Sequence, residues 1–491
     1  GPLSLAALHL LQQRPASLHL PVPELLPMVV RPQLSLHVVP MAKLGSGERK
    51  HDFREVARGY TPDEAAEEAQ RCLQCPRRPC VDGCPVGIAI PDFILALRQG
   101  DMPQAVKVLK QSNNLPAVCG RVCPQETQCQ SRCVVGKRGD SVSIGALERF
   151  VADWELAHGR EPATIAPSTG KEVAVIGSGP AGLTCAADLA RLGHKVVIYE
   201  ALHTAGGVLT YGIPDFRLPA EVVQAEVDYV KSLGVDIKLD MVVGRTITVD
   251  EVLAAGVQAV FISTGAGLPI FLHLPGEDLT GIYSANEFLT RTNLMRAYLY
   301  PAHDTSIRAG RRVAIIGGGN VAMDSARCAL RLGAREVSIV YRRTEEELPA
   351  RLEEVENAKE EGIIFRTLTA PLRFLGDGRG QVVAMECQGM KLGPPDASGR
   401  PRPVPQVDNL FSMAVDTVIL ALGTTPSPLL LSATPGLETS VEGIVIADEH
   451  GRTSRARLWA GGDIVSGAAT VVSAIGAAKK AAMDIDLFLR N

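Results

Sequence analysis

The chain has 491 residues, 46% of them hydrophobic and 21% charged, and its net charge is −4. This length exceeds that of one ordinary domain, and the apolar fraction excludes a chain that is disordered over most of its length. Without a basic excess, binding to nucleic acid or to a membrane surface is not expected, and no apolar run approaches the roughly 18 residues of a membrane span. With 47 glycines and only 4% aromatic residues, the composition favours an α/β fold with glycine-rich turns.

The first 40 residues differ in composition from the rest of the chain. Segment 1–40 is rich in Leu and Pro, and Glu24 is its only acidic residue. We expect this segment to be an N-terminal arm or tail.

Short helices are predicted in the next part of the chain. Residues 60–72 form a helix that Thr61 can cap, with proline at the first helical position. Residues 91–111 read as two helices broken near Gly100 and Pro103, and residues 143–158 as another. A small helical domain therefore occupies residues 41–165 and ends in a Pro/Thr/Ser linker.

Cysteine placement points to a metal-binding module in that domain. Of 11 cysteines, eight fall between Cys72 and Cys133. A secreted disulfide scaffold is short and cysteine-rich throughout, so we expect a reducing, cytoplasmic compartment. Four thiols can bind a 4Fe–4S cluster or a zinc ion, or can remain free. Prolines after Cys84 and Cys123 favour two 4Fe–4S clusters, and the two runs are Cys72, Cys75, Cys80, Cys84 and Cys119, Cys123, Cys129, Cys133.

A strand–turn–helix–strand unit comes after the linker, with strands at 172–177 and 195–200 and a helix at 181–192. In such a unit one glycine permits the tight turn, a second lets the backbone approach a pyrophosphate, and a third allows close packing of helix on strand. Glu200 ends the second strand, where a carboxylate binds ribose hydroxyls, so we expect FAD or NAD(H) here rather than an empty glycine-rich turn. The turn residues are Gly177, Gly179, Pro180, Ala181 and Gly182.

The same unit recurs, with strands at 312–317 and 336–343 and a helix at 321–332. Its second strand ends in Arg342 and Arg343, and guanidinium groups favour the 2′-phosphate of NADP(H). The alternative interpretation of the two arginines is a solvated strand end. The turn residues here are Gly317, Gly318, Gly319, Asn320 and Val321.

Other elements and residues complete the pattern. Strands at 416–423 and 456–463 each run into glycine, and a helix at 470–489 ends the chain. We interpret Cys185 and Cys328 as core residues, and the isolated His158, His194 and His203 as surface or packing residues. No Ser/His/Asp set or HExxH motif indicates hydrolysis.

Several stretches together resemble one family. They include CPVGIAIPDFI, GRVCPQETQCQSRCVVGK, GSGPAGLTCAADLA, IGGGNVAMD, VYRRTEEELPAR and WAGGDIVSGAATVVSAIGAAKKAA. Residues 41–491 resemble the glutamate synthase small (beta) subunit family, which includes the large subunit of the bifurcating NADH-dependent ferredoxin:NADP oxidoreductase and the N-terminal half of dihydropyrimidine dehydrogenase.

The resemblance implies that the two cysteine runs interleave. One cluster would take Cys72, Cys75, Cys80 and Cys133. The other would take Cys84, Cys123 and Cys129, with Glu148 as a fourth, oxygen ligand and Cys119 as a spare thiol. The alternative, in which each run binds its own cluster and Cys119 is a ligand, stays open.

The resemblance also implies a domain order. A helical iron–sulfur domain precedes two Rossmann-like nucleotide-binding domains, with the NADP(H) domain at 305–424 inserted into an FAD domain made of 168–300 and 425–491. Further cofactor-binding residues implied by the match are Gly206, Gly207, Arg217, Gly423, Asp463, Ala469 and Thr470.

The function implied is electron transfer, most like that of the large subunit of the bifurcating enzyme, with the small subunit of NADPH glutamate synthase as the alternative. Hydride would pass between NADP(H) and FAD, and single electrons would pass through the clusters. The partner would be ferredoxin, a second flavin/iron–sulfur subunit of a bifurcating enzyme, or a glutamate synthase large subunit, in a hetero-oligomer. A non-catalytic scaffold that binds no NADP(H) is the alternative of a different class.

Overall fold

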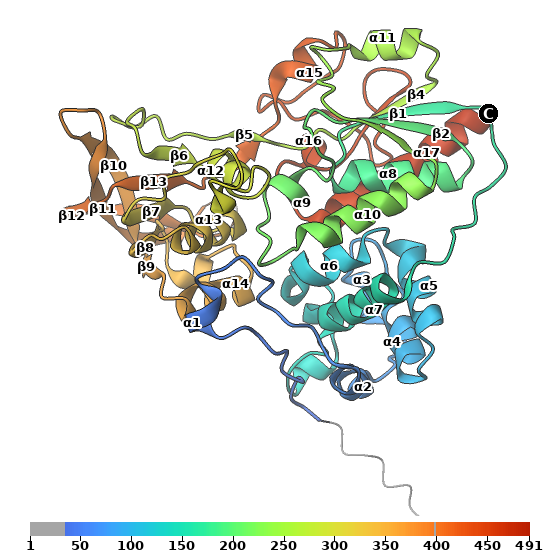
Figure 1. The fold of residues 1–491 in the computed structure, drawn as a ribbon, viewed down its shortest axis with the longest axis horizontal. Coiled ribbons are helices and arrows are strands. Elements are labelled where there is room, and N and C mark those ends of the chain that lie inside the picture. Colours follow the sequence, from blue (N-terminus) through green and yellow to red (C-terminus); the bar gives the residue numbers. More distant parts are fainter. Residues whose placement is uncertain (1–34, 397–398) are drawn as a thin grey trace, which may run out of the picture. The chain divides into compact units, whose positions relative to one another are not determined.

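The computed structural model describes residues 35–396 and 399–491. Residues 1–34 of the predicted N-terminal arm therefore lie outside the described residues. Residues Leu36–Asn491 form one compact unit (Figure 1). In the described ranges, no helix is both long and apolar enough to cross a membrane.

The helical domain contains the predicted helices. Thr61 caps one of them in a capping box with Glu64, so the predicted N-terminus is confirmed. Side chains such as Phe93, Ile94 and Leu147 are fully buried in this domain. Its helices are α1 (Ser46–Arg49), α2 (Pro62–Gln70), α3 (Pro79–Asp82), α4 (Ile90–Arg98), α5 (Met102–Ser112), α6 (Pro116–Val122) and α7 (Ile144–His158), with 3-10 turns at Gln125–Thr127, Gln130–Arg132 and Val135–Lys137.

The first nucleotide-binding domain is built on a parallel sheet in the order β15-β4-β1-β2-β3. Its strands are β1 (Glu172–Ile176), β2 (Lys195–Tyr199), β3 (Asp236–Lys238), β4 (Ala259–Ile262) and β15 (Leu458–Ala460). Because β15 pairs beside β4, the end of the chain returns to complete this sheet.

Helices cover both faces of that sheet (Figure 1). The predicted helices α8 and α17 are confirmed, and both contribute to the same buried cluster as the strands. Helices α8, α10 and α17 lie on one side and α11 and α15 on the other. Their bounds are α8 (Pro180–Arg191), α9 (Val208–Tyr211), α10 (Ala220–Ser232), α11 (Val249–Ala254), α15 (Pro428–Ser432), α16 (Asp463–Ser466) and α17 (Val471–Arg490).

The second nucleotide-binding domain has a parallel sheet in the order β6-β13-β7-β8-β9. Its strand β8 ends at Val340, so Tyr341, Arg342 and Arg343 lie beyond the strand that was predicted to contain them. The bounds are β6 (Ile282–Ser284), β7 (Arg312–Ile316), β8 (Glu336–Val340), β9 (Ile364–Arg366), β13 (Thr417–Leu420), α12 (Ala285–Thr292), α13 (Asn320–Arg331) and α14 (Leu352–Glu360), with 3-10 turns at Ala297–Leu299 and Glu345–Glu347.

Strand β6 and helix α12 precede residue 300, yet both belong to the second domain. A short ribbon of β5 (Leu268–Pro269) and β14 (Thr424–Thr425) joins the segments that enter and leave it. The predicted domain boundaries themselves stay a prediction.

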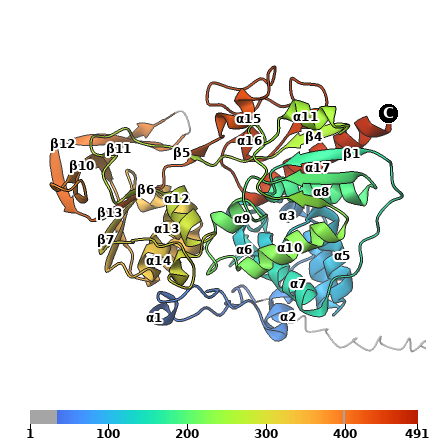
Figure 2. The ribbon, with the colours of Figure 1, turned by 45° about the horizontal axis from the view of Figure 1, so that its top comes forward.

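An antiparallel sheet that the sequence did not predict extends the second domain (Figure 2). Its strands are β10 (Thr369–Gly376), β11 (Val382–Pro395) and β12 (Pro401–Ala414), in that order. Strands β11 and β12 form a long hairpin. Arg343, shortly after β8, bonds Asp396, the residue that follows β11.

A cluster of buried ion pairs lies where the two nucleotide-binding domains meet, and Arg217 is a residue of the first domain that takes part in it. Arg217, in the loop between α9 and α10, lies 2.6 Å from Asp324 of α13. The guanidinium of Arg327 pairs with Glu361 at 2.8 Å and also with Glu354. The placement of Arg217 near FAD stays a prediction, and in the structure its guanidinium pairs with Asp324 and Glu354 of the second domain.

Candidate functional site

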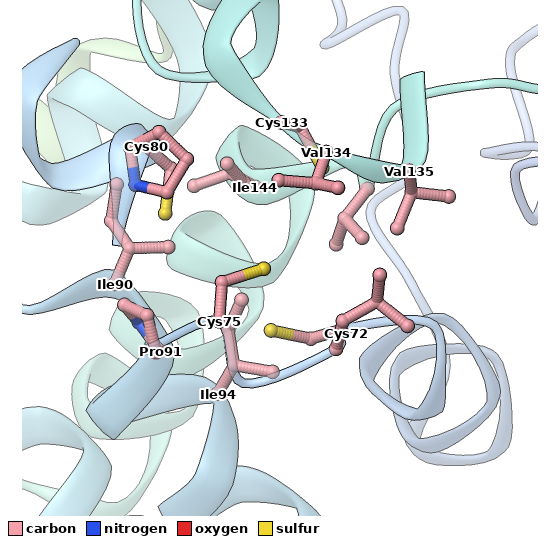
Figure 3. A pocket seen from close by; sticks show the side chains of 13 residues that line it. Cys72, Cys75, Cys80, Ile90, Pro91, Ile94, Cys133, Val134, Val135 and Ile144 are labelled. Carbon is pink, nitrogen blue, oxygen red and sulfur yellow. The ribbon is translucent and has the colours of Figure 1, made fainter. Parts of the chain in front are cut away.

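One pocket in the helical domain is lined by four thiols, those of Cys72, Cys75, Cys80 and Cys133. Figure 3 shows the sulfur atoms of Cys72 and Cys75 directed into this pocket. Three of the four thiols come from the first cysteine run and one from the second. The chain therefore brings together the four residues that the interleaved assignment groups.

The rest of this pocket is apolar, with Ile90, Ile94 and Ile144 among its lining residues. Burial raises the pKa of Cys72 and raises that of Cys80 to about 11, and the neighbouring thiolates add to both effects. All 11 cysteines are free. Among the described residues, no three His, Cys, Asp or Glu side chains meet closely enough to hold a single metal ion.

A second group of thiols surrounds a buried carboxyl group. Glu148 of α7 is only 5% exposed, and its Oε1 accepts a hydrogen bond of 2.8 Å from Asn113. Burial raises the pKa of Glu148 to about 8. Burial also raises the pKa of Cys84 and of Cys129, and the Glu148 charge adds to both shifts.

Cys119 belongs to this second group as well. The Cys119 thiol donates to Asn113 Oδ1 at 3.7 Å. The neighbouring Cys119 thiol and burial together raise the pKa of Cys123 well above its usual value. The Glu148 charge acts on Cys123 in the same direction. The structure thus gathers Cys84, Cys119, Cys123, Cys129 and Glu148, and both candidates for the fourth ligand are present.

The first glycine-rich turn has the geometry of a dinucleotide cradle. Gly177 adopts a φ of +98°, and a Cβ there would lie 2.6 Å from the Ser263 carbonyl oxygen. A Cβ on Gly182 would collide with the Gly177 carbonyl oxygen, whereas one on Gly179 would meet no atom within 4 Å. The space above Gly179 fits a pyrophosphate at the N-terminus of α8.

Glu200 comes directly after β2 and is buried beside this turn. Its Oε2 accepts hydrogen bonds from the Ser178 amide at 2.8 Å and the Ser178 hydroxyl at 2.5 Å. The Ser178 hydroxyl oxygen in turn accepts the Gly206 amide at 3.0 Å. A Cβ on Gly207 would lie 2.8 Å from the Gly179 Cα, so the predicted residues Glu200, Gly206 and Gly207 all pack around the turn.

The segment before α17 reaches the same region. A Cβ on Gly462, next to Asp463, would lie 3.1 Å from the Ala181 side chain. Asp463 Oδ1 accepts the Ala469 amide at 3.2 Å, and Thr470 caps α17 through the Ser473 amide at 3.2 Å. The predicted Asp463, Ala469 and Thr470 therefore form one connected segment at the N-terminus of α17.

Tyr211 is a residue of this region that the sequence interpretation did not single out. Burial raises its pKa to about 12, and the charges of Asp463 and Glu200 contribute. Its hydroxyl also lies near Gly267. The only sequence signal was its position four residues after the predicted Gly207.

The second glycine-rich turn is open in the same way. A Cβ on Gly319 would meet only Pro349, at 4.0 Å, whereas one on Gly317 would collide with Ala421. The Asn320 side chain accepts the Arg351 amide at 2.9 Å. The N-terminus of α13 therefore offers a second phosphate cradle.

The two predicted arginines have different surroundings. Arg342 is exposed, and no residue in the described part of the chain bonds its guanidinium. Arg343 is 5% exposed, with its Nη2 2.9 Å from Asp396 and its Nε 2.8 Å from the Pro401 carbonyl oxygen. Arg343 thus anchors the β11–β12 turn, which leaves Arg342 available to a phosphate.

Gly423 lies just after β13, and its carbonyl oxygen accepts the Ile270 amide at 3.2 Å. It lies at the crossing between the two nucleotide-binding domains rather than in either glycine-rich turn.

The interpretations of Cys185 and Cys328 as core residues are confirmed, since both are fully buried. His194 is a packing residue, bonded to Thr169 and Asp486 at 2.8 Å each.

The helical domain contacts both nucleotide-binding domains. A Cβ on Gly476 of α17 would lie 3.0 Å from the carbonyl oxygen of Pro85, the residue after Cys84. Arg351 donates to the Arg121 carbonyl at 2.8 Å and to Gln125 at 3.2 Å, on either side of Cys123. The loops that carry the second thiol group are therefore held against both domains.

Comparison with known proteins decides the family. Residues 49–160 match the family described as dihydropyrimidine dehydrogenase domain II, 4Fe–4S cluster, and residues 171–480 match the pyridine nucleotide-disulphide oxidoreductases. The NADPH glutamate synthase small chain of Escherichia coli (strain K12) is 36% identical over 441 residues, which cover 88% of this chain and 93% of that one. This chain belongs to the glutamate synthase small-chain family.

Membership of this family makes the chain a pyridine-nucleotide-dependent oxidoreductase with an FAD- and NADP-binding region and an iron–sulfur domain. Another relative is the NADP(+)-dependent formate dehydrogenase subunit beta of Moorella thermoacetica, 39% identical over 438 residues. That alignment covers 84% of this chain but 60% of the relative's length. Relatives of this family thus occur as subunits of different enzymes.

A solved structure supports the fold of the nucleotide-binding part. The structure of Mycobacterium tuberculosis FprA in complex with NADPH superposes with a TM-score of 0.54 at 22% sequence identity. It covers 66% of this chain and 85% of that one. The predicted fold class, a helical iron–sulfur domain followed by Rossmann-like domains, is confirmed.

Proposed function

We propose that this chain is the electron-input subunit of a larger oxidoreductase, binding FAD at the Gly177 turn and NADP(H) at the Gly317 turn. Hydride exchange with NADP(H) and the release of single electrons are the chemistry that FAD and 4Fe–4S clusters supply when bound. The observation that carries the proposal is that the loop after Cys84 packs against α17. A one-electron centre held by that loop would lie beside the flavin-binding domain.

The chain's own residues bind and orient in this proposal. The Gly177 turn, Glu200 and the Gly462–Asp463 segment would hold FAD, and the N-terminus of α17 would face the flavin ring. The dipole of this 20-residue helix favours negative charge at its N-terminus. No side-chain acid or base is assigned a proton-transfer step.

For the clusters, we propose the interleaved assignment. The grouping of Cys72, Cys75, Cys80 and Cys133 around one pocket supports a first cluster. A second would use Cys84, Cys123, Cys129 and Glu148. The contact between Cys119 and Cys123 keeps Cys119 as the competing fourth ligand.

A pair of variants tests the number and ligands of the clusters. We expect Cys75→Ser to remove one electron paramagnetic resonance signal of the reduced protein, and Glu148→Ala to perturb the other. Cys119→Ser serves as the matched control and should leave both signals unchanged. If Cys119→Ser removes a signal while Glu148→Ala leaves both intact, Cys119 is the fourth ligand and the assignment of Glu148 is wrong.

The receiving partner is proposed to be a glutamate-forming large subunit, because the glutamate synthase small chain is matched over 93% of its length. The other electron acceptors that the sequence predicted are ferredoxin and the second flavin/iron–sulfur subunit of a bifurcating enzyme.

Anaerobic purification of the native complex and mass spectrometry of its components test this choice. A co-eluting glutaminase-containing subunit would support it. A small flavin and 2Fe–2S subunit would overturn it in favour of bifurcation. Failure of NADPH to bleach the bound flavin would overturn the proposed function itself.

A further inference from the structure

The residue in the ribose-binding position differs between the two nucleotide-binding domains. In the first domain the Gly177 amide bonds the Tyr199 carbonyl oxygen at 2.8 Å, and the next residue is Glu200. In the second, the Gly317 amide bonds the Val340 carbonyl oxygen at 3.1 Å, and the next residue is Tyr341. Tyr341, not an arginine, therefore takes the place of the ribose-binding carboxylate.

Tyr341 fills the space over the second turn. A Cβ on Gly318 would lie 2.8 Å from its ring, and the side chain is only 8% exposed. Its hydroxyl donates to the Glu347 carbonyl oxygen at 2.9 Å. The ring thus extends from the glycine-rich turn outward to the segment after Arg342.

A third arginine meets Tyr341 at that point. Arg400, at the end of the β11–β12 turn, directs its Nη2 to the Tyr341 hydroxyl at 2.8 Å and to the Glu347 carbonyl oxygen at 2.5 Å. Arg400 as a whole is half-buried, and in the described ranges no carboxylate pairs with its guanidinium. Its Nε and Nη1 donors have no protein partner there and remain open to a ligand.

Arg343 holds this turn in place. The Arg343 guanidinium bonds Asp396 on one side of the turn and the Pro401 carbonyl oxygen on the other. Within the turn, the Asp396 amide donates to the Arg400 carbonyl oxygen at 2.8 Å. Arg343, which was one of the two arginines predicted to bind phosphate, therefore positions the segment that carries Arg400.

Nearby acidic residues have partners of their own. Glu345 pairs with Lys359 at 2.5 Å, and the Thr344 amide donates to Glu347 at 3.0 Å. Glu346 lies 3.3 Å from the Thr344 hydroxyl. None of these three carboxylates is bonded to Arg400 or Arg342.

We propose that Arg400, together with Arg342, recognises the 2′-phosphate of NADP(H), so that a hairpin remote in sequence sets the choice of NADP(H) over NAD(H). This inference rests on the proposed function, because it requires the dinucleotide to bind at the Gly317 turn. Charge-assisted, bidentate bonds to phosphate suit guanidinium groups. Arg342, which follows Tyr341 in the chain, and Arg400, which is bonded to Tyr341, both lack a carboxylate partner among the described residues.

Calorimetric titration of the as-purified holoenzyme with adenosine 2′,5′-bisphosphate and with adenosine 5′-monophosphate tests the proposal without turnover. Arg400→Ala should weaken binding of the bisphosphate by about 10-fold and leave the monophosphate unchanged, since one charged hydrogen-bonding group is lost. Arg402→Ala, an exposed arginine on the same hairpin, is the control and should bind both as the wild type does.

Arg400→Gln separates recognition from folding, because an amide can still donate to Tyr341 and Glu347 but carries no charge. It should lose the same preference for the bisphosphate. If either variant keeps the wild-type preference, Arg400 is a structural residue of the hairpin and the inference is overturned. If the wild type itself does not prefer the bisphosphate, the proposed NADP(H) site fails instead.

Discussion

The two nucleotide-binding domains share one strand–turn–helix–strand plan but build it with different residues. In the first turn the third position must be Gly182, because any Cβ would collide with Gly177. In the second turn the same position is Ala322, which is fully buried in α13. The φ of the first glycine also differs, +98° at Gly177 and +139° at Gly317.

The residue after the second strand makes the larger contrast. Glu200 stays within its own domain, bonded to Ser178. Tyr341 instead connects its turn to a hairpin through Arg400. The hydrogen bonds of the Glu200 side chain therefore stay within a local βαβ unit, whereas those of the Tyr341 hydroxyl include one from Arg400 of the distant β11–β12 hairpin.

The largest expected effect is on the first turn. Gly182→Ala should leave the purified protein with little FAD, because the Gly177 carbonyl must move out of the cradle. The converse change in the second turn, Ala322→Gly, should cost only about 1 kcal/mol of stability through helix propensity. Flavin absorbance per polypeptide measures the FAD content of Gly182→Ala, and denaturant unfolding measures the stability of Ala322→Gly. Full flavin content in Gly182→Ala would show that the first turn tolerates a Cβ at its third position, as the second turn does.

The second effect concerns the ion pairs that join the domains. Arg217→Met would leave the Asp324 and Glu354 carboxylates without one guanidinium, and breaking such a buried pair costs about 3–5 kcal/mol. Urea unfolding monitored by far-UV circular dichroism gives the change. Arg366→Met, an exposed arginine of the second domain, is the control, and equal stability of the two variants would contradict a structural role for Arg217.

The same cluster predicts an acid dependence. Burial raises the pKa of Glu354, but the Arg217 and Arg327 guanidiniums outweigh burial and lower it to about 2. A lowered carboxyl pKa contributes stability above the unfolded value of about 4.5, and this contribution is lost as pH falls toward 2. Arg217→Met should therefore lose stability at a higher pH than the wild type, and coincident acid-unfolding curves would exclude this linkage.

A smaller effect is expected at Arg342. Arg342→Ala should weaken NADPH binding by about 10-fold while NADH binding stays the same, because only the 2′-phosphate contact is lost. Rapid-mixing flavin reduction with each nucleotide gives both dissociation constants. Equal losses for NADPH and NADH would reject the phosphate role.

The smallest effect sharpens the contrast between Tyr341 and Glu200. Tyr341→Phe removes one hydrogen-bonding hydroxyl but leaves Arg400 its bond to Glu347, so we expect NADPH binding to weaken by about 3-fold. Glu200→Gln in the first turn should leave NADPH binding unchanged, because it lies in the other domain. The same rapid-mixing assay compares them, and a loss in Tyr341→Phe as large as that in Arg342→Ala would mean that the ring itself orients the nucleotide.

Much of the site was predictable because its signals are local. A capping box at Thr61, glycines after short strands and Glu200 after β2 are all patterns within a few residues. The carboxylate partners of Arg343 and Arg217 were not predictable, because nothing near either arginine in the sequence indicates a contact with Asp396 or Asp324. Tyr211 was missed for the same reason.

The sequence alone determines the α/β class, the paired glycine-rich turns, the thiol-rich helical domain and the family. These depend on residue type and spacing along the chain. Only the tertiary structure paired Arg343 with Asp396 and Arg217 with Asp324, and brought Arg400 to Tyr341, 59 residues away. Such contacts are decided by how strands pair and helices pack, and no local pattern in the chain encodes which distant partners will meet.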